Sequence, residues 1–164
     1  MFGFILSADI VSQTSYLLER CSVHCKMCAK KCHECAHHCE ESVKEVVSKI
    51  HQDTLKHCIE KCKQCVKECH NCAKKCRSVK NKISDKKMLR QLKHELTVCL
   101  EECKECEKFC RKCKEQCEIE FKRKPSSDML FMCMHECKDC EDVCMICKKV
   151  CEETLAQVEK LLHR

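Results

Sequence analysis

The sequence predicts an all-α protein, an antiparallel up-down-up-down four-helix bundle that forms one domain over residues 1–164 and has a cysteine-lined core. Two observations predict this fold class. Cysteine accounts for 24 of the 164 residues and recurs with one spacing in four separate blocks. The chain has one glycine and one proline, too few for the turns of a β-sandwich, a barrel or a dinucleotide-binding fold.

The four blocks share the spacing CxxxCxxCxxxCxxCxxxC, with the 4, 3, 4, 3, 4 steps of a heptad seam. At about 100° per residue, the cysteines of one block fall within a stripe about 80° wide and about 27 Å long on one helix face. A strand would scatter them over both faces. The blocks consist of Cys21, Cys25, Cys28, Cys32, Cys35 and Cys39; Cys58, Cys62, Cys65, Cys69, Cys72 and Cys76; Cys99, Cys103, Cys106, Cys110, Cys113 and Cys117; and Cys133, Cys137, Cys140, Cys144, Cys147 and Cys151.

Capping and turn residues indicate the helix boundaries. The first link is the least marked and is expected between Ser48 and Thr54. Asp85, after Ser84, caps the third helix, and the segment 125–128 ends that helix and caps the fourth. Short links make consecutive helices antiparallel neighbours. The helices are predicted at about residues 8–46, 53–78, 85–123 and 127–162.

Extending each seam beyond its cysteines distinguishes the two ends of the bundle. One end is expected to be an apolar plug that holds the bundle together, formed by Leu18, Val79, Ile83, Leu89, Leu92, Leu96, Val158 and Leu161. The other end is more polar, with Ser42, Val46, His51, Leu55, Glu120, Lys124 and Leu130 on the seams. We expect anything that enters along the axis to enter at the polar end.

The N-terminal residues and the net charge of the chain indicate where the protein is located and which partners it binds. Residues 1–6 are apolar, but a signal peptide needs a longer apolar region behind positive charge, and a membrane span needs ~20 apolar residues. We therefore expect a cytoplasmic protein with reduced thiols and no membrane partner. The formal net charge of +6 is spread evenly and aromatic residues are few, so nucleic acid binding is not expected.

Inward-facing thiols have three interpretations. Free cysteine can simply fill a core, but 24 without exception would leave the core short of packing energy. Disulfides need Cα atoms about 4.4–6.8 Å apart, whereas neighbouring helix axes lie ~8–10 Å apart. Metal binding fits the spacing, because sulfurs at i and i+3 or i+4 lie one above the other on a helix face.

Two properties of the core predict which metal it binds: the softness of thiolate ligands and the net charge that remains after the metal has bound. Sites made only of thiolates select Cu(I), Zn(II) or an iron–sulfur cluster, and the usual iron–sulfur motifs are absent. One Cu(I) for each thiolate leaves the core neutral. An isolated Zn(II) held by four thiolates leaves a buried charge of −2, which is costly. Many Cu(I) ions per chain, bridged by thiolates, are therefore the best chemical fit.

With its repeated, inward-facing CxxxC pairs on four helices, the chain resembles the bacterial copper storage proteins, in particular their cytosolic members. The resemblance covers about residues 15–155. It implies a four-helix bundle that stores Cu(I) at CxxxC pairs such as Cys21/Cys25, and it implies a homo-oligomer. It also implies an ion entrance with histidine or methionine at one bundle end. The residues here that correspond loosely to this entrance are His51, His57, Met129 and Met132.

Other functions remain open as alternatives. A general thiolate sink for Zn or Cd is the closest, and a Cu(I) chaperone or sensor would need far fewer thiols. An enzyme is not expected, because identical mid-helix cysteines single out no nucleophile. Most histidines lie off the seam, among them His33, His37 and His70, and these are expected at the surface.

Overall fold

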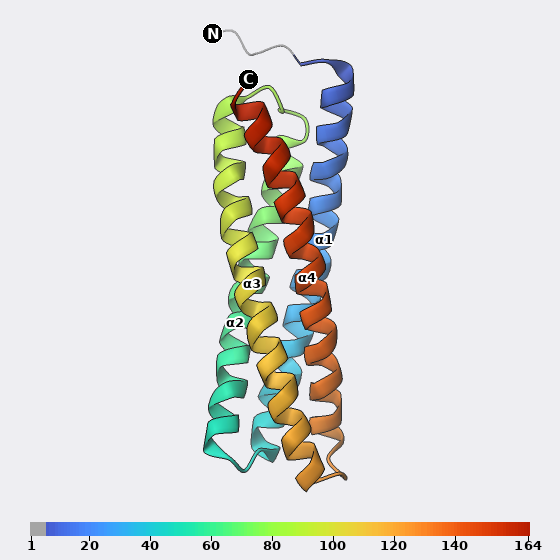
Figure 1. Cartoon of the computed structure of the whole chain (residues 1–164), viewed down its shortest axis with the longest axis vertical. Coiled ribbons are helices and arrows are strands. Elements are labelled where there is room, and N and C mark those ends of the chain that lie inside the picture. The colour runs from blue at the N-terminus through green and yellow to red at the C-terminus, as the bar shows by residue number, and fades with distance from the viewer. Residues whose placement is uncertain (1–5) are drawn as a thin grey trace.

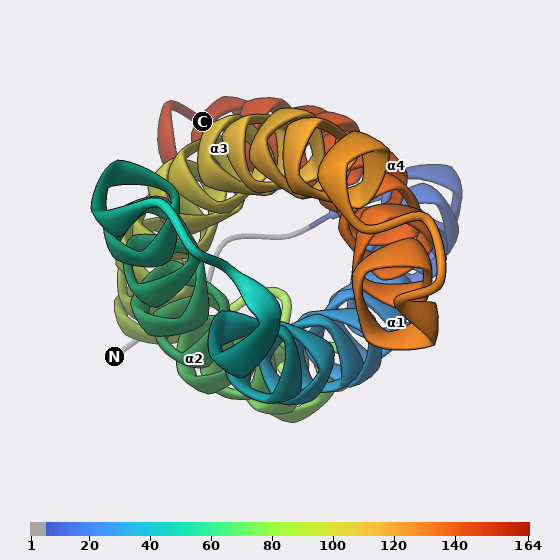
Figure 2. The same ribbon diagram turned by 90° about the horizontal axis from the view of Figure 1, so that it is seen from below.

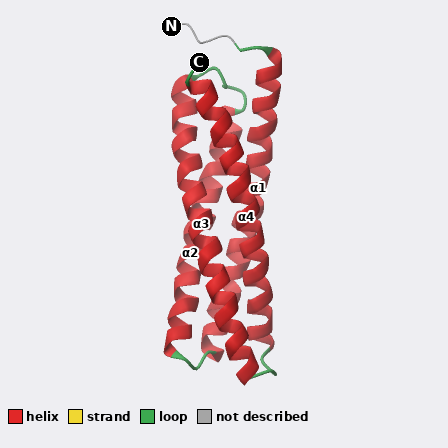
Figure 3. Cartoon of the chain, in the orientation of Figure 1, coloured by secondary structure: helices red, strands yellow, loops and turns green. Residues whose placement is uncertain are grey.

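The computed structural model describes residues 6–164 and contains four long helices that run side by side along one axis (Figure 1). Figure 3 shows helices and short links, with no strand among the described residues. The apolar residues 1–5, on which part of the leader-peptide expectation rests, lie outside the described residues. The elements are α1 (Ala8–Ser42), the 3₁₀ turn η1 (Val43–Glu45), α2 (Lys49–Val79), α3 (Lys86–Arg123) and α4 (Asp128–Leu162).

The helices form a ring in chain order, with α4 packed against α1 (Figure 2). The chain runs down α1, up α2, down α3 and up α4, as the colours of Figure 1 show. Contacts between sulfurs agree with this course: Cys39, late in α1, meets Cys133, early in α4, while Cys21 meets Cys151. The all-α four-helix bundle predicted from the cysteine spacing is confirmed.

The first link is shorter than predicted. The α-helical part of α1 ends at Ser42 and continues as a 3₁₀ turn to Glu45, and α2 begins at Lys49, four residues before the predicted start. Thr54, expected in the link, lies inside α2, where its hydroxyl donates to the carbonyl of Ile50 at 3.1 Å. The buried Val46 anchors the turn, and its carbonyl accepts a hydrogen bond from Gln52 Nε2 at 2.7 Å. The chain therefore reverses within three residues.

The caps of the later helices agree with the sequence. Asp85 Oδ1 accepts hydrogen bonds from the N–H groups of Lys87 and Met88 at 3.0 and 3.2 Å. Ser127 Oγ accepts one from the N–H of Leu130 at 3.2 Å. Each cap satisfies backbone donors that have no partner inside the helix, so α3 and α4 begin within one residue of the predicted positions.

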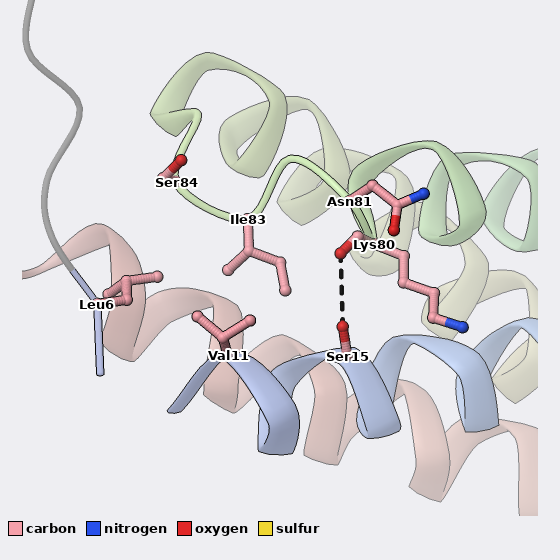
Figure 4. A pocket seen from close by; sticks show the side chains of 7 residues that line it. All are labelled: Leu6, Val11, Ser15, Lys80, Asn81, Ile83 and Ser84. Carbon is pink, nitrogen blue, oxygen red and sulfur yellow. Dashed lines mark hydrogen bonds between the residues drawn. The ribbon is translucent and has the colours of Figure 1, made fainter. Parts of the chain in front are cut away.

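The apolar plug is present at the end of the bundle that holds the α2–α3 link. Its eight predicted side chains are all buried. Figure 4 shows the link against the first turns of α1, with Ile83 near Val11 and the Ser15 hydroxyl donating to the Lys80 carbonyl at 3.5 Å. None of the described helices has an apolar stretch long enough to cross a membrane.

The plug supplies the large apolar side chains that the cysteine stripes lack, so truncating it should destabilise the metal-free bundle. We expect Leu92→Ala, at a fully buried position, to lower the free energy of unfolding by about 2–5 kcal/mol. Urea unfolding of the reduced, metal-free protein measures this change. Lys104→Ala, at an exposed position of the same helix, is the control, and an equal loss there would contradict the role given to the plug.

Candidate metal centre

The four cysteine stripes face one another around the bundle axis. Every one of the 24 cysteines is a buried free thiol, and none is more than 1% exposed. Each helix brings its stripe inward because the intervening residues are mostly charged or polar and remain at the surface. The centre of the bundle is therefore a column of sulfur, as the spacing predicts.

The sulfurs lie close together both along the helices and between them. Within α1, the Sγ atoms of Cys21 and Cys25 are 3.9 Å apart, as are those of Cys28 and Cys32. Between neighbouring helices, Cys28 Sγ lies 3.7 Å from Cys144 Sγ on α4 and 3.8 Å from Cys65 Sγ on α2. Each thiol thus has partners on its own helix and on the helices beside it.

Thiols on diagonally opposite helices also meet. Cys32 on α1 and Cys106 on α3 have their sulfurs 3.6 Å apart, and Cys39 and Cys113 have theirs 3.4 Å apart. The column is therefore narrow, because cysteine is short enough for all four helices to approach the axis together. Ions inside it would be surrounded by sulfur on every side.

The sulfurs form overlapping groups of four, each with all its sulfurs within 4.8 Å of one another. Neighbouring groups share members: Cys28 and Cys65 belong to two groups, and so do Cys32 and Cys144. The groups include Cys21/Cys25/Cys72/Cys151, Cys25/Cys99/Cys147/Cys151, Cys28/Cys32/Cys65/Cys144, Cys28/Cys65/Cys69/Cys103 and Cys32/Cys106/Cys140/Cys144. These shared cysteines link the groups along the axis instead of separating them.

The spacing of the sulfurs suits a metal ion. At a metal–sulfur distance of about 2.3 Å, tetrahedral ligands lie about 3.8 Å apart and trigonal ligands about 4.0 Å apart. The Sγ–Sγ distances of 3.6–4.0 Å that recur along the column fall in this range. A soft ion could be held with little movement of the backbone, which is consistent with a metal-binding role.

The pKa of a thiol in this column depends on the neighbouring thiols to which it is hydrogen-bonded. Hydrogen bonding to Cys113 and Cys133, together with burial, raises the pKa of Cys39 well above its usual value. Cys133 has the opposite shift: S–H groups of Cys113 and Cys117 donate toward it and lower its pKa, with Cys117 Sγ at 3.2 Å. Metal ions would replace these shared protons as the charge that holds the sulfurs together.

The polar end is closed by a buried carboxylate. Glu120 is 2% exposed, and its Oε1 lies 2.6 Å from His51 Nδ1, 3.4 Å from the N–H of Ser48 and 3.8 Å from Arg123 Nη1. Beside it, the buried Ser42 donates from its hydroxyl to the carbonyl of Met129 at 3.0 Å. These contacts connect the start of α2 to the last turns of α3, and the end of α1 to the start of α4.

The structure separates the four candidate entrance residues. The His51 side chain is 14% exposed and lies against Glu120 at the end of the column. His57 is exposed and lies beside Phe109, with ring centroids 6.0 Å apart, and Met129 and Met132 are about half exposed on α4. Glu120 was not among the candidates. Its place on the extended seam was the one sequence signal for its role.

Comparisons of the chain with models of protein families, with curated proteins and with solved structures found no match. The interpretation of this centre therefore rests on its residues and their geometry.

The Glu120 contacts predict an acid-sensitive end of the bundle. Burial raises the pKa of Glu120, but hydrogen bonds from His51 and from the N–H groups of Ser48 and Val47 outweigh it, and the pKa is lowered. A carboxyl group with a depressed folded-state pKa stabilises the fold above its unfolded pKa of about 4.3, and that contribution is lost as the pH falls through the folded value.

We therefore expect Glu120→Gln to lower stability at neutral pH and to reduce the loss of stability between about pH 5 and pH 3. Urea unfolding across this range measures both effects. Glu118→Gln, on the exposed face of the same helix, should retain the wild-type pH profile. An unchanged acid limb in Glu120→Gln would contradict the role assigned to this carboxylate.

Proposed function

We propose that this protein is a cytosolic copper store that binds many Cu(I) ions per chain through the inward-facing thiolates. The observation that carries the proposal is the sharing of cysteines between overlapping groups along the column. A thiolate that belongs to two groups can bridge two ions. The chain could therefore bind more Cu(I) ions than separate one-ion sites would allow. A chaperone or sensor needs an exposed site with few thiols, and 24 buried thiols do not suit that task.

Copper(I) is favoured over zinc by charge. One Cu(I) for each thiolate gives a neutral column, which suits an interior from which solvent is excluded. Zinc sites of four separate thiolates would each hold a charge of −2, and the formal +6 of the chain resides on side chains that remain at the surface. The tetrahedral fit of the sulfur groups makes a general Zn or Cd sink the second candidate.

Storage here means sequestration, without catalysis. A reduced column of thiolates surrounded by four helices keeps bound Cu(I) from water and from redox cycling. Binding releases protons, because the ligands must be thiolates. The resemblance to bacterial copper storage proteins supports this role and leads us to propose a homo-oligomer as well.

We place the ion entrance at the polar end, with His51 as its innermost residue. Glu120 lies against His51 Nδ1 at 2.6 Å, which orients the ring and leaves Nε2 for a metal ion, an arrangement common among metal-binding histidines. His57, Met129 and Met132 lie on the outer surface of the same end. They would meet an ion before it reaches His51.

An anaerobic titration tests the storage proposal. Reduced protein is titrated with Cu(I) in the presence of a coloured Cu(I) chelator, and the titration is repeated with Zn(II) in excess. We expect the protein to withhold Cu(I) from the chelator until many equivalents per chain are bound, with Zn(II) failing to displace it.

Each other outcome of this titration identifies a different function. Saturation at one to three Cu(I) ions would overturn storage in favour of a chaperone or sensor. Displacement of copper by Zn(II) would make the column a general divalent-metal sink.

A second experiment tests the entrance. We expect a bulky apolar side chain at His51 or Ser42, as in His51→Phe, to slow Cu(I) uptake in stopped-flow measurements at least several-fold, because both positions lie at the end of the column. Leu92→Phe at the opposite end and His70→Phe, at an exposed position of α2 away from the entrance, are the controls. Equal slowing by Leu92→Phe would place the entrance elsewhere.

A further inference from the structure

Outside the column, α1 carries a second set of potential metal ligands at the spacing of one helical turn. His33 and His37 are one helical turn apart in the segment His33-Glu34-Cys35-Ala36-His37. Two histidines at i and i+4 project from one helix face with Cβ atoms about 5–6 Å apart, and this HExxH spacing on a helix is a known way to hold a metal ion. Both residues are exposed, whereas Cys35 between them faces the column.

The two histidines line the same surface hollow between α1 and α2. The hollow has a volume of about 310 Å³ and is completed by Ala36, Glu40, Lys63 and Val66. Glu40 follows His37 by three residues, so His33, His37 and Glu40 repeat the 4–3 spacing and lie on one face. The pKa of Glu40 is lowered, mainly by a hydrogen bond from Lys63 and also by the charges of His37 and His33, and all four residues line the hollow.

We propose that His33, His37 and Glu40 form an exterior site for a borderline divalent cation such as Zn(II), Ni(II) or Cu(II). Imidazole and carboxylate suit these ions, whereas the all-thiolate column selects softer ones. Binding exchanges two surface contacts for metal bonds: Lys63 Nζ to Glu40 Oε1 at 2.8 Å, and His37 Nε2 to Glu41 Oε1 at 3.1 Å. Exposed pairs of this kind contribute little to stability.

The neighbouring residues limit the site to binding. In a peptidase, the glutamate of HExxH acts as general base. Here Glu34 pairs with Lys31 at 3.1 Å and is not among the residues that line the hollow, so the proposal extends to binding alone. His38, beside His37, faces the other side of the helix, where its Nε2 lies 4.0 Å from Glu136 of α4. The site therefore consists of His33, His37 and Glu40 alone.

Chelated nickel tests the site without reaching the buried thiols. Ni(II)–nitrilotriacetate has two open coordination positions, and its bulk keeps it out of the column. We expect calorimetric titration of the reduced protein to show one complex per chain, and His33→Ala or His37→Ala to weaken binding at least tenfold. His70→Ala, an exposed histidine on α2, should bind like wild type.

The third ligand is tested with Ni(II)–iminodiacetate, which has three open positions. Glu40→Gln should weaken binding of this complex several-fold and leave nitrilotriacetate binding unchanged. Equal affinity in wild type and His33→Ala, or no binding by wild type, would overturn the proposal, and circular dichroism would confirm that the variants are folded. The site does not depend on copper storage, so either proposal can fail without the other.

Discussion

The close approach of four helices over a small side chain is the constraint on which this structure depends. Cysteine occupies every position of the heptad seam in the central part of each helix, and several of the other residues buried beside it there are small, such as Ala29, Ala36 and Ala73. Sulfurs consequently meet across the diagonal, as Cys39 and Cys113 do at 3.4 Å. The narrow column, the overlap of its sulfur groups and the exclusion of water all follow from this approach.

Apolar packing and the sulfur column occupy different parts of the bundle. The thiol column offers little apolar volume, so large buried side chains such as Leu89, Leu92 and Leu96 gather at one end. The opposite end has fewer such side chains, among them Leu55 and Leu130, and is held as well by polar contacts around Glu120 and His51. Polar contacts of this kind can exchange partners more readily than packed leucines can be displaced, which suits an end through which ions are proposed to pass.

Two kinds of potential metal ligand occupy two different faces of α1. Thiols lie inside, where mutual hydrogen bonding and burial raise the pKa of residues such as Cys39. On the outer face of α1, His33 and His37 share a surface hollow with Glu40. The same 4–3 spacing therefore recurs on two faces of α1, and by the proposals made above, ligand hardness would decide which ion suits which face.

The sequence by itself determined the four helices, the inward cysteine stripes and the apolar plug, because heptad spacing and the scarcity of glycine and proline leave one way to bury those faces. It placed the first link several residues too late, since the caps at Ser48 and Thr54 are weak local signals and the turn is decided by the burial of Val46.

Only the tertiary structure decided which sulfurs meet across helices, that Glu120 holds His51, and that His57, Met129 and Met132 lie on the outer surface. Contacts between helices depend on their relative rotation and height. The rotation and height of each helix are set by its packing against the other helices along the whole bundle. They cannot be predicted from the sequence of one helix alone.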